Sequence, residues 1–170
     1  MNFNRLMHAP VTDATSNKRV GRIADMILSE NGKRIIGIVV TNDSLLYTKR
    51  FYPWKNVLSV SVFGVSVRGL GERYFRTDER EKNVSLQTDV YGKSVCQGNV
   101  DLGIMRDAEI DLKAAKLLCL EISRGLTEDI LRGRDSISVE QGFKTDKSEL
   151  HVSEQEVLHR KRNGNRKNKE

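Results

Sequence analysis

The densest group of chemically active side chains in this 170-residue chain is cationic and lies at its C-terminal end. Residues 159–170 hold six basic side chains and one acidic one, a net charge of +5, whereas the whole chain carries +6. Such a cluster can neutralise several phosphates and give a salt-sensitive affinity for nucleic acid. The predicted nucleic-acid or anion-binding set is Arg160, Lys161, Arg162, Arg166, Lys167 and Lys169. A disordered basic end that only aids solubility is the equally weighted alternative.

A second stretch, residues 50–55, interleaves basic and aromatic side chains in the order RFYPWK. Aromatic rings can stack on nucleobases while basic groups meet phosphates. Arg50, Tyr52, Trp54 and Lys55 are therefore a possible interaction surface. We favour a structural interpretation, in which the rings fill a core and the charges face water.

No residue pattern names a reaction. Nucleophilic catalysis needs a nucleophile beside a base, and the three histidines, His8, His151 and His159, are scattered along the chain. The two cysteines, Cys96 and Cys119, lie in neither a metal-binding nor a redox spacing. We therefore expect no enzymatic activity, no catalytic residue, no metal site and no cofactor.

Composition narrows the class of protein further. The longest apolar stretch is residues 35–40, far short of the ~20 residues that a membrane-spanning helix needs. No secretory signal is visible at the start, and the cysteine usage is typical of reduced thiols. We expect a cytoplasmic protein without membrane insertion.

Residues 1–158 hold 23 basic and 22 acidic side chains, so this near-neutral body favours a protein partner over a polyanion.

The clearest local structure is a β-hairpin between Val20 and Val40. Two Ile- and Val-rich runs flank Asn31-Gly32, a pair that suits a tight turn because both residues tolerate positive φ. Residues 58–62 alternate apolar and polar side chains with a period of two, which predicts another strand. Pro53 must lie at a strand end or edge, since it cannot donate a ladder hydrogen bond.

The second half is ambiguous by itself. Residues 105–122 have helical composition and spacing. However, Gly103 and Asp107 lie 82 positions after Gly21 and Asp25, and apolar positions stay in register at the same offset. This internal repeat predicts a second hairpin, with residues 111–115 as its turn. After Ser153, a capping-box spacing predicts a short helix from residue 154 to about 161.

The stretch VGRIADMILSENGKRIIGIVV, followed by FYPWKNV and SVSV, resembles the PRC-barrel domain family. The motif residues are Gly21, Asp25, Gly32 and Pro53 in the first copy, and Gly103 and Asp107 in the second, which has Ala114 in place of Gly32. The resemblance covers about residues 9–67 and 90–152. It implies a distant relation to the cytoplasmic domain of the photosynthetic reaction-centre H subunit and to the C-terminal domain of the ribosome maturation factor RimM.

The resemblance implies a mainly β protein with two small PRC-type β-barrels in tandem, a short C-terminal helix and a disordered basic tail. The expected divisions are a first barrel at 1–70, a charged linker at 71–86, a second barrel at 87–152, and the helix and tail at 153–170. The expected function is a non-catalytic binding or adaptor protein with an unknown protein partner. The alternative is a ribosome- or RNA-associated factor that uses the tail for phosphate contacts.

Overall fold

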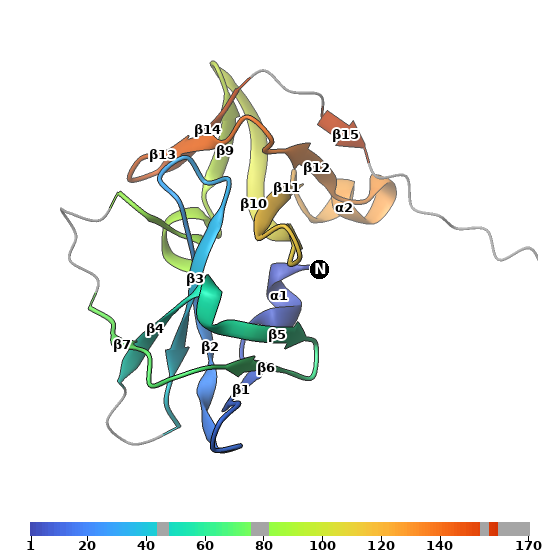
Figure 1. Ribbon diagram of the computed structural model, residues 1–170. Helices are drawn as coiled ribbons and strands as arrows, with labels where there is room; N and C mark the ends of the chain where they lie inside the picture. Colours follow the sequence, from blue (N-terminus) through green and yellow to red (C-terminus); the bar gives the residue numbers. More distant parts are fainter. Residues whose placement is uncertain (44–47, 76–81, 154–156, 160–170) are drawn as a thin grey trace, which may run out of the picture.

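The computed structural model describes residues 1–43, 48–75, 82–153 and 157–159, and these form two β-sheets (Figure 1). The strands of the first sheet are β1 (Pro10–Asp13), β2 (Arg19–Leu28), β3 (Ile35–Thr41), β4 (Lys49–Pro53), β5 (Val57–Ser61), β6 (Gly64–Val67), β7 (Glu72–Arg73) and β8 (Val84–Ser85). Those of the second are β9 (Ser94–Gln97), β10 (Val100–Asp111), β11 (Lys116–Ser123), β12 (Asp135–Ser138), β13 (Phe143–Thr145), β14 (Glu149–Val152) and β15 (Val157–His159). The short helical elements are α1 (Phe3–Leu6), η1 (Trp54–Asn56), η2 (Leu86–Val90) and α2 (Leu126–Arg132).

The two sheets repeat one strand order. The first runs β5-β6-β1-β2-β3-β4-β7, with β8 added to β2, and the second runs β13-β14-β9-β10-β11-β12-β15. Each contains one parallel pair at the equivalent place, β1 with β6 and β9 with β14. Among the described strands no pairing joins the two ends of either sheet. The structure therefore confirms the predicted mainly β class, and the two sheets share one strand order. Closure of either sheet into the predicted barrel is not seen among the described strands.

Residues 105–122 form strands of a hairpin, as the repeat predicts and against their helical propensity. β10 and β11 pair antiparallel on either side of the turn at 112–115. Met105, Leu120 and Ile122 from these strands are fully buried. Burial of one face of a sheet outweighs the few tenths of a kcal/mol per residue by which propensity favours a helix.

Gly21 and Gly103 occupy the same position in the two hairpins. Their φ angles are 152° and 124°. A Cβ at Gly21 would lie 2.1 Å from the Thr41 carbonyl oxygen, and one at Gly103 would lie 2.5 Å from that of Ser123. Both glycines therefore allow a close approach between neighbouring strands.

The segment that precedes each repeat crosses to the other repeat. Asp25 in β2 accepts hydrogen bonds from the Ser85 hydroxyl and, at 3.0 Å, from the Gln87 backbone N–H. The equivalent Asp107 in β10 accepts them from the Asn2 side-chain amide at 3.2 Å and the Asn4 backbone N–H at 3.0 Å. We call residues 1–7 and 84–90 the two arms. Both aspartates are buried, so each arm satisfies a buried carboxylate of the opposite sheet.

The two hairpin turns also meet reciprocally. The Ile35 N–H donates to the Ala115 carbonyl at 2.8 Å, and the Leu117 N–H donates to the Lys33 carbonyl at 3.0 Å. The arms bury Phe3, Leu6, Leu86 and Val90 completely, and these residues belong to one hydrophobic cluster that spans both sheets. The two repeats thus share a single core.

Both ends of the range 71–86, predicted as a charged linker, contain strand residues in the structure. Its first part contributes β7 to the edge of β4, and its last part contributes β8 to β2. Val84, Ser85 and Leu86 are buried, because they begin the arm that covers the first hairpin.

The predicted C-terminal helix is wrong where the structure describes it. Val157–His159 form β15, which pairs antiparallel with β12. An isolated helix of this length is marginal in water, whereas the exposed edge of β12 offers backbone hydrogen bonds to an extended segment. Among the described residues, no helix has the length and apolar character needed to cross a membrane.

We predict that Asp25→Ala and Asp107→Ala each lower the free energy of unfolding by about 2–4 kcal/mol, because each removes the acceptor shared by several hydrogen-bond donors of an arm. Urea denaturation of the full chain measures this. Glu30→Ala, at an exposed turn position, is the control and should change it by less than about 0.5 kcal/mol. A loss of less than about 0.5 kcal/mol in both aspartate variants would show that the hydrogen bonds to the arms contribute little to the stability of the fold.

Candidate functional site

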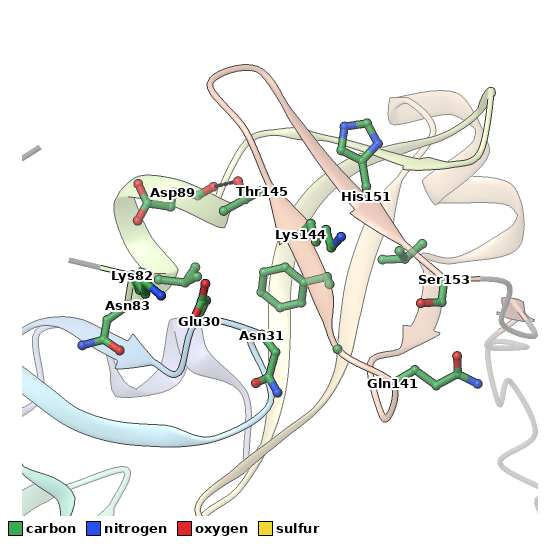
Figure 2. Close-up of a pocket in the computed structure, with 14 residues that line it drawn as sticks. Glu30, Asn31, Lys82, Asn83, Asp89, Gln141, Lys144, Thr145, His151 and Ser153 are labelled. Atoms are coloured by element: carbon green, nitrogen blue, oxygen red, sulfur yellow. Dashed lines mark hydrogen bonds between the residues drawn. The ribbon is translucent and has the colours of Figure 1, made fainter. Parts of the chain in front are cut away.

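A groove of about 770 Å³ lies where the first hairpin turn meets the end of the second sheet (Figure 2). We call it the inter-sheet groove. The first repeat and the connection after it supply Glu30, Asn31, Lys82, Asn83 and Val84, η2 supplies Asp89, and the second sheet supplies residues 141–145 and 151–153. Because both repeats line the groove, it exists only when the two sheets are packed together.

Asn31 holds the first-repeat side of the groove. Its side-chain oxygen accepts the Ser29 hydroxyl at 2.8 Å and the Lys33 N–H at 3.2 Å, which fixes the turn. Its backbone carbonyl accepts the Phe143 N–H at 3.1 Å. Gly142 permits this approach, since a Cβ there would lie 2.4 Å from the same carbonyl oxygen.

Phe143 forms the apolar floor together with Val84 and Val152, all of which are buried. The ring packs directly on Gly32, where a Cβ would lie 2.2 Å from the nearest ring atom. Gly32 also has a φ of 71°. The turn glycine predicted from Asn31-Gly32 therefore has a second role, as a contact between the two repeats.

Hydrogen bonds of Thr145 connect the elements on the second-sheet side of the groove. The Thr145 hydroxyl donates to the Asp89 carbonyl at 3.0 Å, drawn as a dashed line in Figure 2. The same hydroxyl oxygen lies 2.9 Å from the Lys93 ammonium, which donates to it. These bonds join β13 to the second arm, so the groove has a fixed width on this side.

Three potential metal ligands, Asp146, Glu149 and His151, lie close together, and His151 also lines the groove. His151 Nε2 is 3.1 Å from Asp146 Oδ2 and 3.8 Å from Glu149 Oε2. The ligand atoms of all three lie within 4.8 Å of one another. However, Asp146 already accepts the backbone N–H groups of Glu149 and Ser148 at 2.8 and 2.9 Å. The cluster therefore has a structural use, which is to close the turn between β13 and β14.

The groove offers charged and polar groups that can bind a ligand. Acidic Glu30 and Asp89 and basic Lys82 and Lys144 face it, and Asn83 adds a neutral amide beside them. The Thr145 hydroxyl is bonded to a backbone carbonyl, and the His151 ring to a carboxylate, so these two groups are not paired as nucleophile and base. A mixed-charge groove with an apolar floor suits a ligand that carries both charges and hydrogen-bonding groups.

The predicted surface at residues 50–55 is divided by the fold. The Tyr52 side chain is only 1% exposed and belongs to the core, whereas Trp54 is partly buried and packs against it. Arg50 donates to the carbonyls of Leu70 and Gly71 at 2.9 and 3.1 Å, and Lys55 is exposed. Tyr52 is thus almost wholly buried, as the structural interpretation expects of the rings in this stretch, whereas an interaction surface at residues 50–55 stays a prediction.

Two further predictions concern Pro53 and the basic tail. Pro53 ends β4 opposite Gly37, where no ladder N–H is required of it. The six basic residues of the tail, 160–169, lie outside the described residues.

Sequence reasoning missed the groove because Phe143 and Asn31 are 112 positions apart. The local signals were the turn glycines Gly32 and Gly142, which indicate turns without indicating that the two turns touch.

One family model matches part of the chain. Residues 1–81 match the family model of the PRC-barrel domain, a range that includes the first arm and the first sheet as far as β7. None of the curated proteins compared with the chain matches it.

We predict that Gly32→Ala destabilises the protein by about 1–3 kcal/mol more than Gly92→Ala. Both glycines have positive φ, 71° and 79°, so both variants carry the backbone cost of a left-handed residue, about 1–2 kcal/mol. Only at Gly32 does the new methyl meet a ring, and overpacking adds about 1–3 kcal/mol. A Cβ at Gly92 meets nothing within 4 Å. Equal losses in urea denaturation would contradict the Gly32–Phe143 contact.

We also predict that Asp146 titrates below its ordinary pKa of 3.8, because the N–H groups of Glu149 and Ser148 and the ring of His151 stabilise its ionised form. A lowered pKa in the folded state stabilises the turn above pH 3.8, and this contribution is lost as the pH falls through the folded-state pKa. Carboxyl chemical shifts measured by NMR against pH test this. A midpoint at or above 3.8 would contradict the turn geometry.

Proposed function

We propose that this protein, which carries a PRC-barrel domain at residues 1–81, is a non-catalytic binding module whose partner is another protein. In this proposal residues 87–152 are a second, divergent PRC-type unit, and the inter-sheet groove receives an extended segment of the partner. The observation that carries the proposal is the make-up of the groove, which sets opposite charges and amide groups around an apolar floor.

The shape of the second sheet supports an extended ligand. β13 pairs with β14 on one side and ends the sheet on the other, and it lines the groove. Extended peptides bind at such places through backbone hydrogen bonds, while pockets for alternate side chains give specificity. The floor at Phe143 can take an apolar side chain, and Lys144 and Glu30 can take charged ones on either side.

The repeated topology supports the second unit. Each strand from β9 to β15 has a counterpart at the same place in the first sheet. The two buried aspartates, Asp25 and Asp107, both bind the opposite arm. A tandem of two such units has more surface for partners than one, and the near-neutral charge of residues 1–158 suits a protein partner better than a polyanion.

The rival function is association with RNA or the ribosome through the basic tail, whose net charge of +5 favours phosphate contacts. The two functions differ in salt dependence. Tail binding to RNA should weaken steeply as salt rises, whereas a peptide in a partly apolar groove should be much less affected.

Affinity capture from the native cell tests the proposal with four forms of the full chain: wild type, Lys144→Glu, Lys55→Glu and a variant lacking residues 160–170. Lys144 lines the groove, whereas Lys55 is an exposed lysine on η1, so the two charge reversals are matched. We expect a protein that wild type, Lys55→Glu and the tail-deleted form retain at high salt, and that Lys144→Glu loses at least tenfold.

Two results would contradict the groove proposal. Retention that depends on residues 160–170 and disappears at high salt would favour the RNA function. Retention that is lost in Lys55→Glu but kept in Lys144→Glu would move the binding surface to residues 50–55. Far-ultraviolet circular dichroism of each variant checks that the fold is preserved.

A further inference from the structure

A second cavity, of about 380 Å³, opens at the end of the first sheet away from the inter-sheet groove. Three basic residues, Lys18, Arg19 and Arg50, line it where the β1–β2 turn approaches the start of β4. We call it the basic cavity. Its volume lies within the usual range for small-molecule sites, about 300–1,000 Å³.

Among the described residues that line the basic cavity, Asp13 is the one acidic side chain, and its carboxylate is already engaged. It accepts the Ser16 N–H at 3.0 Å and the Ser16 hydroxyl at 2.6 Å. These bonds lower the pKa of Asp13, the hydroxyl of Ser16 being the largest cause. The carboxylate therefore stabilises its own turn, and among the described residues it makes no salt bridge with Lys18, Arg19 or Arg50.

The basic groups are positioned to different degrees. Arg50 is anchored by donating to the Leu70 and Gly71 carbonyls at 2.9 and 3.1 Å through one nitrogen, Nη1. A guanidinium has five donors, so the other nitrogens are not engaged by the described part of the chain. Arg19 contacts Asp43 through its Nε at 3.0 Å. Among the described residues Lys18 makes no ion pair.

The second repeat provides an internal comparison. Arg50 pairs with Val40, and at the equivalent place Asp135 pairs with Ile122. Counting back from the equivalent glycines, Gly21 and Gly103, Arg19 corresponds to Asp101 and Lys18 to Val100. The same fold therefore forms with acidic and apolar residues at these positions. The three cations are not required by the architecture and are specific to the first repeat.

We infer that the basic cavity binds a small organic phosphate. Lys18, Arg19 and Arg50 would contact the phosphate, since arginine donates to phosphate oxygens in pairs and lysine adds a compact charge. Val20 and Val40, which also line the cavity, would contact the organic part. This site is separate from the inter-sheet groove and does not depend on the protein-binding proposal.

The test is a titration of the full-length, ¹⁵N-labelled protein with AMP, inorganic phosphate and adenosine, followed by amide chemical shifts. We expect saturable shifts at residues 18–20 and 48–52 with AMP, and weaker ones at the same amides with inorganic phosphate. Adenosine should cause none. Lys18→Gln should weaken AMP binding about tenfold, as expected for the loss of one charge-assisted contact. The matched control Lys113→Gln, an exposed lysine in the second hairpin turn, should bind AMP like the wild type.

Three results would overturn the inference. The first is that AMP and phosphate leave these amides unshifted at millimolar concentration, and the second is that Lys18→Gln and Lys113→Gln bind AMP equally well. Shifts produced only by an RNA oligonucleotide with hydroxyl ends would also overturn it, because they would assign the cations to a polymer and not to a small phosphate. An unchanged thermal midpoint in Lys18→Gln would exclude unfolding as the cause of weaker binding.

Discussion

The structure depends on two buried aspartates, each of which is satisfied by the arm of the other repeat. Asp25 and Asp107 lie at equivalent positions in the two long hairpins, and a buried carboxylate is costly unless hydrogen bonds compensate for its lost hydration. One donor to each carboxylate is local, the N–H of Met26 for Asp25 and that of Ala108 for Asp107. The others come from residues far away in the chain, Ser85 and Gln87 for Asp25 and Asn2 and Asn4 for Asp107. Neither hairpin can bury its aspartate at low cost without the arm of its neighbour. The carboxylates therefore couple the two repeats into one folding unit.

The inter-sheet groove follows from this coupling. The second arm carries Val84 and Asp89 into the groove, and the reciprocal bonds between Ile35, Ala115, Lys33 and Leu117 fix how the two turns meet. Phe143 can then rest on Gly32 and bond to Asn31. The two repeats share a topology but differ in surface chemistry. Lys18, Arg19 and Arg50 of the first repeat correspond to Val100, Asp101 and Asp135 of the second, so one architecture carries different side chains at equivalent positions.

The repeated hairpin could be predicted from sequence because its signals are local or periodic. Asn31-Gly32 marks one turn, and the offset between Gly21 and Gly103 fixes the register of the other, even where propensity favours a helix. The exchange of arms could not be predicted, since Asn2 and Asp107 are 105 positions apart and nothing local indicates that they pair. The same limit applies to the C-terminal segment. Ser153 and Glu156 have the spacing of a helix cap, but no local sequence pattern indicates that the following residues can pair with the edge of β12.

The coupling of the repeats is tested most directly by native-state hydrogen exchange of the Gln87 and Asn4 amides, the N–H groups that donate to Asp25 and Asp107. If the arms hold the two sheets in one unit, both amides exchange only on global unfolding, with the same free energy as core amides of β3 and β10. Exchange through local opening, at a free energy several kcal/mol lower and different for the two arms, would show that the repeats are independent and that the arms merely rest on them.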